Sequence, residues 1–475
     1  MRSLGVQDLK IFDTLSVTEK ELDTSNGVRI YLCGVTVYDD SHIGHARTII
    51  VFDTLRRFLE LQGIKVKFIQ NFTDVDDKII NRAVSESVSA DKISSRYISN
   101  YFTEFDRLNV KRADMYPKAT EHIEAMIDLI KSLIEKGSAY VSANGVYFSV
   151  SKFHDYGKLS KKKIDELVSG ARVEVDDTKK DPLDFALWKF ADDDPKWQSP
   201  WGAGRPGWHI ECSAMSLKYL GTDFEIHGGG RDLIFPHHEN EIAQSESYSG
   251  KNFAKIWMHV GMVTIGGEKM SKSLGNTKSV DFVLKKWGAN IIRLFCLLGH
   301  YSKPIDYSEE MLKETITKWR QAENCYYELI LSENSSAESI DIESMKKIIT
   351  ETRKEFFDSL NYDFNTSLAI GAFFKLVKAT NQVAASERLT KPISDIVLPV
   401  LEQMLDVLGL RISSVTEEER KKIDALIEKR NLLRSEKKFQ EADAIREELS
   451  DMGIILIDHK RKVLWMKQEK IGDSS

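Results

Sequence analysis

The order of predicted elements near the N-terminus restricts the fold of this chain more than any other feature. Arg29–Cys33 reads as a strand that stops at Gly34, and Gly44–Leu61 carries apolar residues at helical spacing. Gly63 ends that helix, and Ile64–Phe68 alternates like a second strand. A strand, a helix and a strand in this order form a parallel pair with a crossover helix. We therefore predict an α/β fold built on a parallel sheet.

The size and charge of the chain narrow its class. At about 150 residues per domain, 475 residues predict roughly three domains. With 42% apolar and 29% charged residues the chain is not disordered as a whole. The net charge is −6, from 67 basic and 73 acidic residues, so any contact with nucleic acid must be local.

The cysteine count and the apolar runs indicate the cellular compartment of the protein. Four cysteines are too few for a disulfide framework and suit a reducing compartment. Met1–Phe12 lacks the apolar core of a signal peptide. The longest apolar run, Ile291–Gly299, falls far short of the ~20 residues that span a bilayer. We expect a cytoplasmic protein without a membrane segment.

Further along, the chain changes from mixed to helical character. Asp223–His227 and Ile256–Val260 are strand-like, and the signal is almost purely helical from Ser308 onward. Residues 411–475 predict a small separate module with a helix at Phe439–Leu449 and a strand after Gly453. Its end carries a local excess of basic residues, which could meet phosphates or form a solvated tail: Lys460, Arg461, Lys462, Lys467 and Lys470.

A first candidate phosphate site is His42-Ile43-Gly44-His45, where the first strand gives way to the helix. A phosphate there would meet the free N–H groups and the positive dipole end of that helix. Gly44 allows the backbone to approach closely, and the imidazoles of His42 and His45 can donate to phosphate oxygens. Two surface histidines beside a turn would give the same four residues.

A second candidate is the loop Lys269-Met270-Ser271-Lys272-Ser273, which follows two glycines. Lysines three residues apart on such a loop can converge on a polyphosphate. As flexible point charges they suit charge that moves during a reaction. An exposed basic loop is the plain alternative.

Together the two motifs resemble the paired signature of class I aminoacyl-tRNA synthetases. The resemblance implies a Rossmann-type catalytic domain that binds ATP at the carboxyl ends of its strands, where Gly44 would also contact the nucleotide. It implies in-line attack of an amino-acid carboxylate on the α-phosphate, with His42 and His45 stabilising the transition state. Lys269 and Lys272 would hold the departing pyrophosphate together with Mg²⁺.

Four side chains with suitable chemistry could form a zinc site, although their spacing alone does not bring them together. Two of them, His237 and Glu241, are four residues apart and would share one face of a helix. Two thiolates, an imidazole and a carboxylate suit tetrahedral zinc. The cysteines could instead be buried core thiols, and His238 or Glu239 could replace a neighbouring ligand. The four are Cys33, Cys212, His237 and Glu241.

Eight sequence blocks, in family order, are similar to cysteinyl-tRNA synthetases. The resemblance implies one zinc ion per chain, held by the four side chains just named. It implies a pocket for L-cysteine lined by Gly34, Thr73, Trp208 and His227, with ATP and tRNA(Cys) as the other substrates. The blocks are Cys33–Asp39, His42–His45, Asn71–Lys78, Phe185–Lys189, Arg205–Met215, His227–Gly230, Phe235–Glu246 and Gly266–Asn276.

The chemistry of cysteine and serine justifies a metal in such a pocket. The two differ by one atom, which a fitted pocket separates poorly. At pH 7 a thiol loses its proton at a cost of ~2 kcal/mol, while a hydroxyl near the pKa of water would cost ~12 kcal/mol. Zinc prefers the soft thiolate. We expect the substrate thiolate to become an extra zinc ligand, so that no editing domain is needed.

Simpler roles exist for the pocket residues. Trp208 could be a packing residue, His227 could make a structural hydrogen bond, and Thr73 could cap the helix near Asp76. Cys296 and Cys325 are expected to be inert core residues.

The resemblance also implies a domain plan and a monomer. Trp465 would fit a late family tryptophan that could stack on a base. Residues 458–464 depart from the family pattern, which leaves the residues that read the anticodon open. The plan has the first half of the catalytic domain at 1–120, an insertion at 121–204, the second half with the lysine loop at 205–307, a helical bundle contacting the tRNA stem at 308–410, and an anticodon-binding module at 411–475.

The expected activity is ATP-dependent attachment of cysteine to its tRNA through cysteinyl-adenylate. One alternative is a ligase that acylates an amino sugar in thiol biosynthesis, but such relatives lack a module like residues 411–475. A second alternative is a non-catalytic zinc-containing RNA-binding protein, against which the intact phosphate-binding motifs speak.

Overall fold

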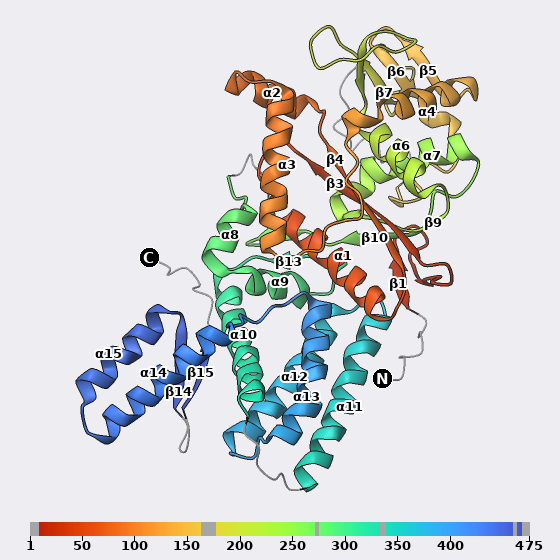
Figure 1. Cartoon of the computed structure of the whole chain (residues 1–475). Coiled ribbons are helices and arrows are strands. Elements are labelled where there is room, and N and C mark those ends of the chain that lie inside the picture. Colours follow the sequence, from red (N-terminus) through yellow and green to blue (C-terminus); the bar gives the residue numbers. More distant parts are fainter. Residues whose placement is uncertain (1–8, 163–176, 271–274, 333–338, 459–462, 468–475) are drawn as a thin grey trace. The chain divides into compact units, whose positions relative to one another are not determined.

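The computed structural model describes residues 9–162, 177–270, 275–332, 339–458 and 463–467. The chain divides into two compact units. The first comprises residues 1–280, 299–306 and 361–364, and the second comprises residues 281–298, 307–360 and 365–475. Figure 1 shows the first unit as mixed helix and strand and the second as mainly helical.

The first unit is built on a four-stranded parallel sheet with the strand order β10-β9-β3-β4. Its central strand β3 is buried at most positions because a parallel sheet is covered on both faces. This confirms the predicted α/β fold and crossover. The elements are β3 (Val28–Thr36), α1 (Ile43–Leu61), β4 (Val66–Thr73), β9 (Phe224–Gly230) and β10 (Ala254–Val260).

Two helices follow β4, namely α2 (Asp77–Glu86) and α3 (Ala90–Arg107). The carboxylate of Asp76 accepts from the backbone N–H of Lys78 at 2.8 Å and so caps α2. The capping role considered for Thr73 is therefore wrong, since Thr73 is the last residue of β4.

Residues 119–206, between β4 and β9 in the chain, contain an antiparallel sheet whose hydrophobic core also includes Ile210, Ala214 and Ala243. The strand order is β5-β6-β7-β8, and α4 packs on this core through Ile123, Ile127 and Ile130. The elements are η1 (Ala119–His122), α4 (Ile123–Glu135), β5 (Ala139–Ser142), β6 (Gly145–Phe148), η2 (Val150–Lys152), β7 (Phe185–Phe190) and β8 (Gly204–Pro206).

The chain then returns to the parallel sheet and builds the region beside its carboxyl edge. Residue Phe235 interrupts this path with an extended backbone, φ −138° and ψ 133°. The elements are α6 (Trp208–Leu220), η3 (Arg231–Leu233), η4 (Ile234–His238) and α7 (Glu239–Ser249). The small strands of the unit are β1 (Lys10–Asp13), β2 (Thr18–Glu21), β11 (Val263–Ile265), β12 (Glu268–Lys269) and β13 (Ile305–Asp306).

The second unit is helical apart from a C-terminal hairpin, as the sequence predicts. Residues 411–416 form no helix and separate α13 from α14. Its elements are α8 (Val280–Trp287), α9 (Ala289–Leu298), α10 (Glu309–Ile330), α11 (Ser339–Asn361), α12 (Thr366–Ala385), α13 (Lys391–Leu408), α14 (Glu417–Ser435), α15 (Phe439–Asp451), β14 (Ile454–Asp458) and β15 (Val463–Lys467), of which the end residues Val280 and Asn361 belong to the first unit.

Trp465 lies in the core of the C-terminal module. The side chain is buried, its Nε1–H donates to Asp424 at 3.0 Å, and its ring is 5.7 Å from that of Tyr327. The expectation that this ring stacks on a base is wrong, because the module needs it for packing. Cys296 and Cys325 are also buried, as expected of core residues.

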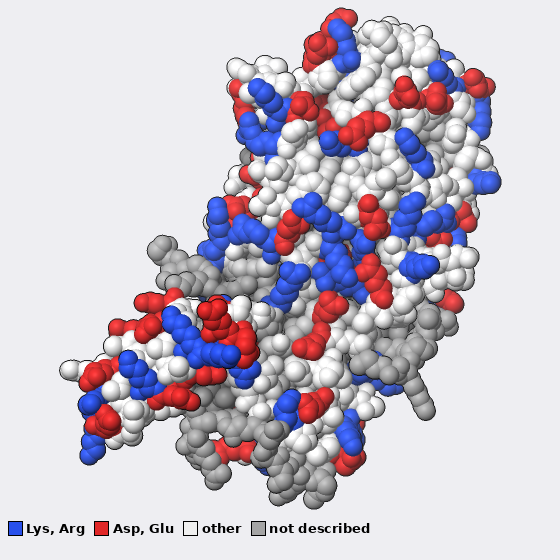
Figure 2. Space-filling model, viewed as in Figure 1, with Lys and Arg blue, Asp and Glu red and all other residues white. Residues whose placement is uncertain are grey.

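The charges of this module are mixed rather than basic. Figure 2 shows both signs interspersed over α14 and α15 on the side in view. Lys467 pairs with Glu419 at 3.0 Å. The other members of the basic patch, Lys460, Arg461, Lys462 and Lys470, lie outside the described residues. Among the residues described, no helix has the length and apolar character that crossing a bilayer requires.

Candidate active site and metal centre

A pocket of about 330 Å³ lies beside the carboxyl ends of β3 and β4 and the first turn of α1. Parallel α/β sheets bind ligands at this edge. Nine of the residues singled out in the sequence line the pocket, together with Gly44 between two of them. They are Cys33, Gly34, His42, His45, Thr73, Trp208, Cys212, His237 and Lys269 with Gly44.

The first turn of α1 is held by its own histidines. Nδ1 of His42 accepts from the backbone N–H groups of Gly44 and His45 at 3.1 and 3.3 Å, and the backbone N–H of His42 donates to Nδ1 of His45 at 3.4 Å. The two rings stack at 3.7 Å. Because each Nδ1 accepts, each neutral ring carries its proton on Nε2, which leaves both rings as donors.

Gly44 is required by this arrangement. A Cβ at Gly44 would lie 2.9 Å from Cε1 of His42 and 3.0 Å from its Nδ1. A larger residue would therefore push the first histidine out of its capping position. From the sequence we expected Gly44 to allow a ligand to approach the backbone closely. The structure shows that Gly44 also leaves space for the ring of His42.

Lys269 ends the β11–β12 hairpin and lines the same pocket. Gly266 and Gly267 form its turn with φ of 61° and 79°, conformations that other residues rarely adopt. The carboxylate of Asp306 holds the turn by accepting from the N–H of Gly267 at 2.9 Å. Lys272, the second lysine of the motif, lies outside the described residues.

The structure brings the four expected metal ligands together. One ligand atom each from Cys33, Cys212, His237 and Glu241 lies within 4.8 Å of the others, and all four residues are buried. Oε1 of Glu241 is 3.0 Å from Nε2 of His237 and 3.4 Å from Sγ of Cys33. The four come from β3, α6, η4 and α7.

The backbone explains how Cys33 reaches this cluster. The register between β3 and β4 shifts between Leu32 and Val35, so Cys33 and Gly34 lie in an irregularity of the sheet. The N–H of Gly34 donates to Oδ1 of Asn71 at 2.9 Å, and an added Cβ would lie 1.6 Å from the carbonyl oxygen of Asn71. Only glycine fits beside this ligand.

The electrostatics of the cluster suit a bound cation. Burial alone would raise the pKa of Glu241, but His227 and His237 lower it to about 2. Burial would likewise lower the pKa of His237, but Glu241 raises it to about 10. A cation that replaces the proton of His237 would therefore meet an ionised carboxylate.

The two thiols differ in their pKa. Burial raises the pKa of Cys33 well above its usual range. A hydrogen bond from Cys33 lowers the pKa of Cys212 to about 6, although burial opposes it. The cluster also leaves Oε2 of Glu241 without a hydrogen bond. Two sulfurs, one nitrogen and one carboxylate oxygen, buried and incompletely satisfied, fit a zinc ion.

The expected amino-acid residues do not all lie at the surface of the pocket. Trp208 is partly exposed at the start of α6, with its ring 4.3 Å from that of His237. The hydroxyl of Thr73 bonds to the buried carboxyl of Glu211. His227 is fully buried below the pocket, with Nε2 at 3.4 Å from Oε2 of Glu241 and 3.6 Å from Sγ of Cys33.

The two alternative ligands named from the sequence have different environments. Glu239 faces away and accepts from the backbone N–H groups of Gly157, Leu159 and Ser160 at 2.8–3.4 Å. His238 faces the cluster, with Nε2 at 3.3 Å from Sγ of Cys33. The other nitrogen of His238 contacts His259 at 2.7 Å.

Sequence reasoning missed two further residues of this region. Asp232 is an exposed carboxylate in the pocket wall after the three glycines of β9, and Arg47 is fully buried two residues beyond His45. The sequence carried a signal for Arg47, since an arginine inside an apolar helix face needs hydrogen-bond acceptors. It carried no signal for Asp232.

Comparisons with known proteins agree with this geometry. The family model tRNA synthetases class I (C) catalytic domain matches residues 19–317, and the DALR domain matches residues 355–413. The chain is 47% identical to a cysteine–tRNA ligase of Thermodesulfovibrio yellowstonii over 485 residues, covering 96% of this chain and 99% of that protein. It is 47% identical to one of Carboxydothermus hydrogenoformans, covering 97% and 100%.

A solved structure shows the same fold at low identity. Mycobacterium tuberculosis methionyl-tRNA synthetase in complex with methionyl-adenylate superposes with a TM-score of 0.61 at 16% identity. The match covers 80% of this chain and 90% of that one.

Proposed function

The chain belongs to the cysteine–tRNA ligase family of class I aminoacyl-tRNA synthetases. From this premise we propose which residues of its pocket bind the nucleotide and which bind the amino acid. The enzyme attaches L-cysteine to tRNA(Cys) with ATP as the energy source. One observation carries the assignment of residues: the metal cluster and the first turn of α1 line one pocket, so amino acid and nucleotide can meet there.

The nucleotide end is assigned to the histidines and to the lysine loop. The Nε2–H groups of His42 and His45 donate to phosphate oxygens as charge develops on the α-phosphate, and the N-terminus of α1 adds its dipole. Gly44 lets the nucleotide approach the backbone. Lys269 and Lys272 hold the leaving pyrophosphate, to which Mg²⁺ binds with ATP.

The amino-acid end is assigned to the residues around the metal cluster. Gly34, Thr73 and Trp208 border the space for L-cysteine, and Asp232 offers a carboxylate to its ammonium group. His227 acts from below, where its imidazole keeps the carboxylate of Glu241 ionised. This assignment places the amino-acid carboxylate toward the histidines of α1 for in-line attack.

Cys33, Cys212, His237 and Glu241 are the residues that would hold one zinc ion per chain. When bound, zinc supplies a soft Lewis acid that favours the thiolate of cysteine over the hydroxyl of serine. The ligands lie on three separate stretches of chain, so their positions depend on the sheet that joins them.

The tRNA partner is assigned to the second unit. The helical bundle at 308–410 would contact the tRNA stem and the module at 411–475 the anticodon, with the catalytic halves at 1–120 and 205–307 and the insertion at 121–204. We propose that the protein acts as a monomer. The amino-sugar ligase and the non-catalytic RNA-binding protein are not favoured, because relatives that match nearly the whole chain are cysteine–tRNA ligases.

Exchange of pyrophosphate into ATP tests this proposal. We expect exchange to depend on L-cysteine without tRNA, and transfer of cysteine to follow when a tRNA(Cys) transcript is added. The C212S variant or a chelated enzyme should lose activation of cysteine by at least 100-fold. Charging of an amino sugar in place of tRNA, or unchanged rejection of serine by C212S, would contradict it.

A further inference from the structure

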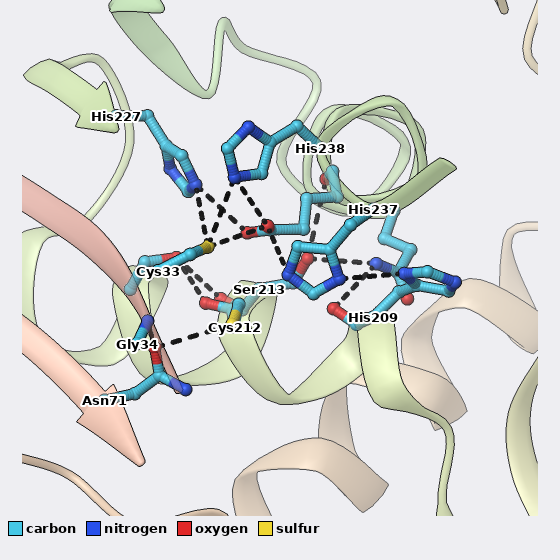
Figure 3. Close-up of polar contacts among 12 residues, drawn as sticks. Cys33, Gly34, Asn71, His209, Cys212, Ser213, His227, His237 and His238 are labelled. Atoms are coloured by element: carbon cyan, nitrogen blue, oxygen red, sulfur yellow. Dashed lines mark hydrogen bonds and ion pairs between the residues drawn. The ribbon is translucent and has the colours of Figure 1, made fainter. Parts of the chain in front are cut away.

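A second group of buried potential ligands adjoins the first. Cys33, His227, His238 and Glu241 also place one ligand atom each within 4.8 Å of one another. Figure 3 shows the rings of His227 and His238 pointing toward Cys33 from the side opposite Cys212. The two groups have Cys33 and Glu241 in common and differ in their other members.

The distances within this second group fit a tetrahedral ion. Metal bonds of about 2.0–2.3 Å place neighbouring ligand atoms about 3.3–3.8 Å apart. Sγ of Cys33 lies 3.6 Å from Nε2 of His227 and 3.3 Å from Nε2 of His238. Oε2 of Glu241 lies 3.4 Å from Nε2 of His227.

The surroundings of these side chains also resemble those of metal ligands. Nδ1 of His238 is 2.7 Å from Nε2 of His259, whose Nδ1 is 2.8 Å from the hydroxyl of Thr14. Such a contact fixes a ring and directs its other nitrogen at an ion. Oε2 of Glu241, which is fully buried, makes no hydrogen bond and faces Nε2 of His227 at 3.4 Å, so this oxygen and this nitrogen could bind one cation together.

We propose that Cys33, His227, His238 and Glu241 form a second site for a divalent cation of the zinc type, fused to the first. Glu241 offers Oε1 on the side of His237 and Oε2 on the side of His227, and so can bridge two ions. The thiolate of Cys33 is the other shared ligand. Two cations about 3.5–4 Å apart repel each other, so the second ion binds more weakly and only at elevated zinc.

Occupation of the second site would have one consequence that rests on the proposed function. The second ion would share Cys33 and Glu241 with the first, which is the ion that selects the thiol, and would weaken the bonds of these two ligands to it. Excess zinc would therefore inhibit activation of cysteine by raising the KM for cysteine, with little change in the KM for ATP.

The stoichiometry of metal binding tests the site independently of any activity. Metal-free protein is titrated with Zn²⁺, bound metal is measured by mass spectrometry after equilibrium dialysis, and the titration is repeated with Co²⁺ to record its thiolate absorption. We expect two ions per wild-type chain, the second at least 10-fold weaker, and one ion in H238Q. The fully exposed His154 is the control, and H154Q should retain two.

A second variant separates loss of ligand from loss of fold. C212S removes a ligand of the first site only and should still bind one ion with the absorption of a single thiolate, while H227Q should behave as H238Q. One ion in the wild type, or two in both H238Q and H227Q, would overturn the proposal. Because no ATP, cysteine or tRNA is present, neither result bears on charging activity, and failure of charging would not alter the stoichiometry.

Discussion

The guanidinium of Arg47 donates a hydrogen bond of 2.9 Å to the carbonyl oxygen of Gly261. The guanidinium is fully buried and also donates to the carbonyl oxygens of Met262, His300 and Lys303 at 2.7–3.2 Å. It therefore ties α1, the helix capped by His42, to the segment that leads into the lysine hairpin.

Replacement of Arg47 should loosen both nucleotide-binding motifs at once. R47M leaves several buried carbonyl groups without a donor and should lower the free energy of unfolding by about 3 kcal/mol. In pyrophosphate exchange we expect the KM for ATP to rise several-fold while the KM for cysteine stays within two-fold. R112M, at an exposed arginine, is the control. Equal effects on both substrates would show that Arg47 serves stability alone.

A methyl group at Gly44 should impair the nucleotide end without touching the metal cluster. The added Cβ meets the ring of His42 at 2.9–3.0 Å, so G44A should displace it. Misplacement of a catalytic group by about 1 Å can cost about 100-fold in rate. We expect a 10- to 100-fold loss in kcat/KM for exchange and unchanged zinc content. G371A, where an added Cβ meets nothing within 4 Å, should be neutral.

Glu239 should matter for the metal centre although it binds no ion. It lies between His237 and Glu241 in the chain and holds the loop at residues 157–160 through three backbone N–H groups. E239A should reduce zinc affinity by about 10- to 100-fold, as loss of supporting contacts does. A chelator competition assay measures it, with E121A at an exposed site as control. Wild-type affinity in E239A would refute this.

The stability of the first unit should depend on pH through Asp13. Burial alone would raise the pKa of Asp13, but hydrogen bonds from Lys20 and from the backbone N–H of Trp257 lower it. A lowered pKa contributes stability fully above the unfolded value of about 3.9, and this is lost as pH falls through the folded value.

We therefore expect D13N to be less stable than wild type by about 1–3 kcal/mol at pH 7. The difference should shrink as the pH is lowered below about 4. Urea unfolding at several pH values measures it, and D128N, at an exposed position, should follow the wild type throughout. A difference that stays constant down to pH 3 would argue against the role of the charge.

The fold could be predicted from the sequence where periodicity is strong. β3, α1 and the long C-terminal helices follow from patterns within one stretch of chain. The interior position of Trp465 could not, because a tryptophan near basic residues is equally compatible with a packed core and an exposed platform. Only the cluster around Tyr327 decides between them.

The metal cluster shows the same limit more sharply. His237 and His238 are adjacent in the sequence. No local pattern predicts that both approach Cys33, His237 beside Cys212 and His238 beside His227. Their directions depend on the extended backbone at Phe235 just before them. Arg47 was likewise missed as a link, since its four acceptors lie more than 200 residues away in the chain.

The metal ligands are far apart in the chain, and this determines when during synthesis the protein can bind an ion with all of them. During synthesis Cys33 leaves the ribosome long before Glu241, and the β3–β9 pairing that aligns them needs the whole intervening insertion. A nascent chain that ends before α7 has no complete centre. An ion that binds all four ligands must therefore be loaded late in translation or after release of the chain.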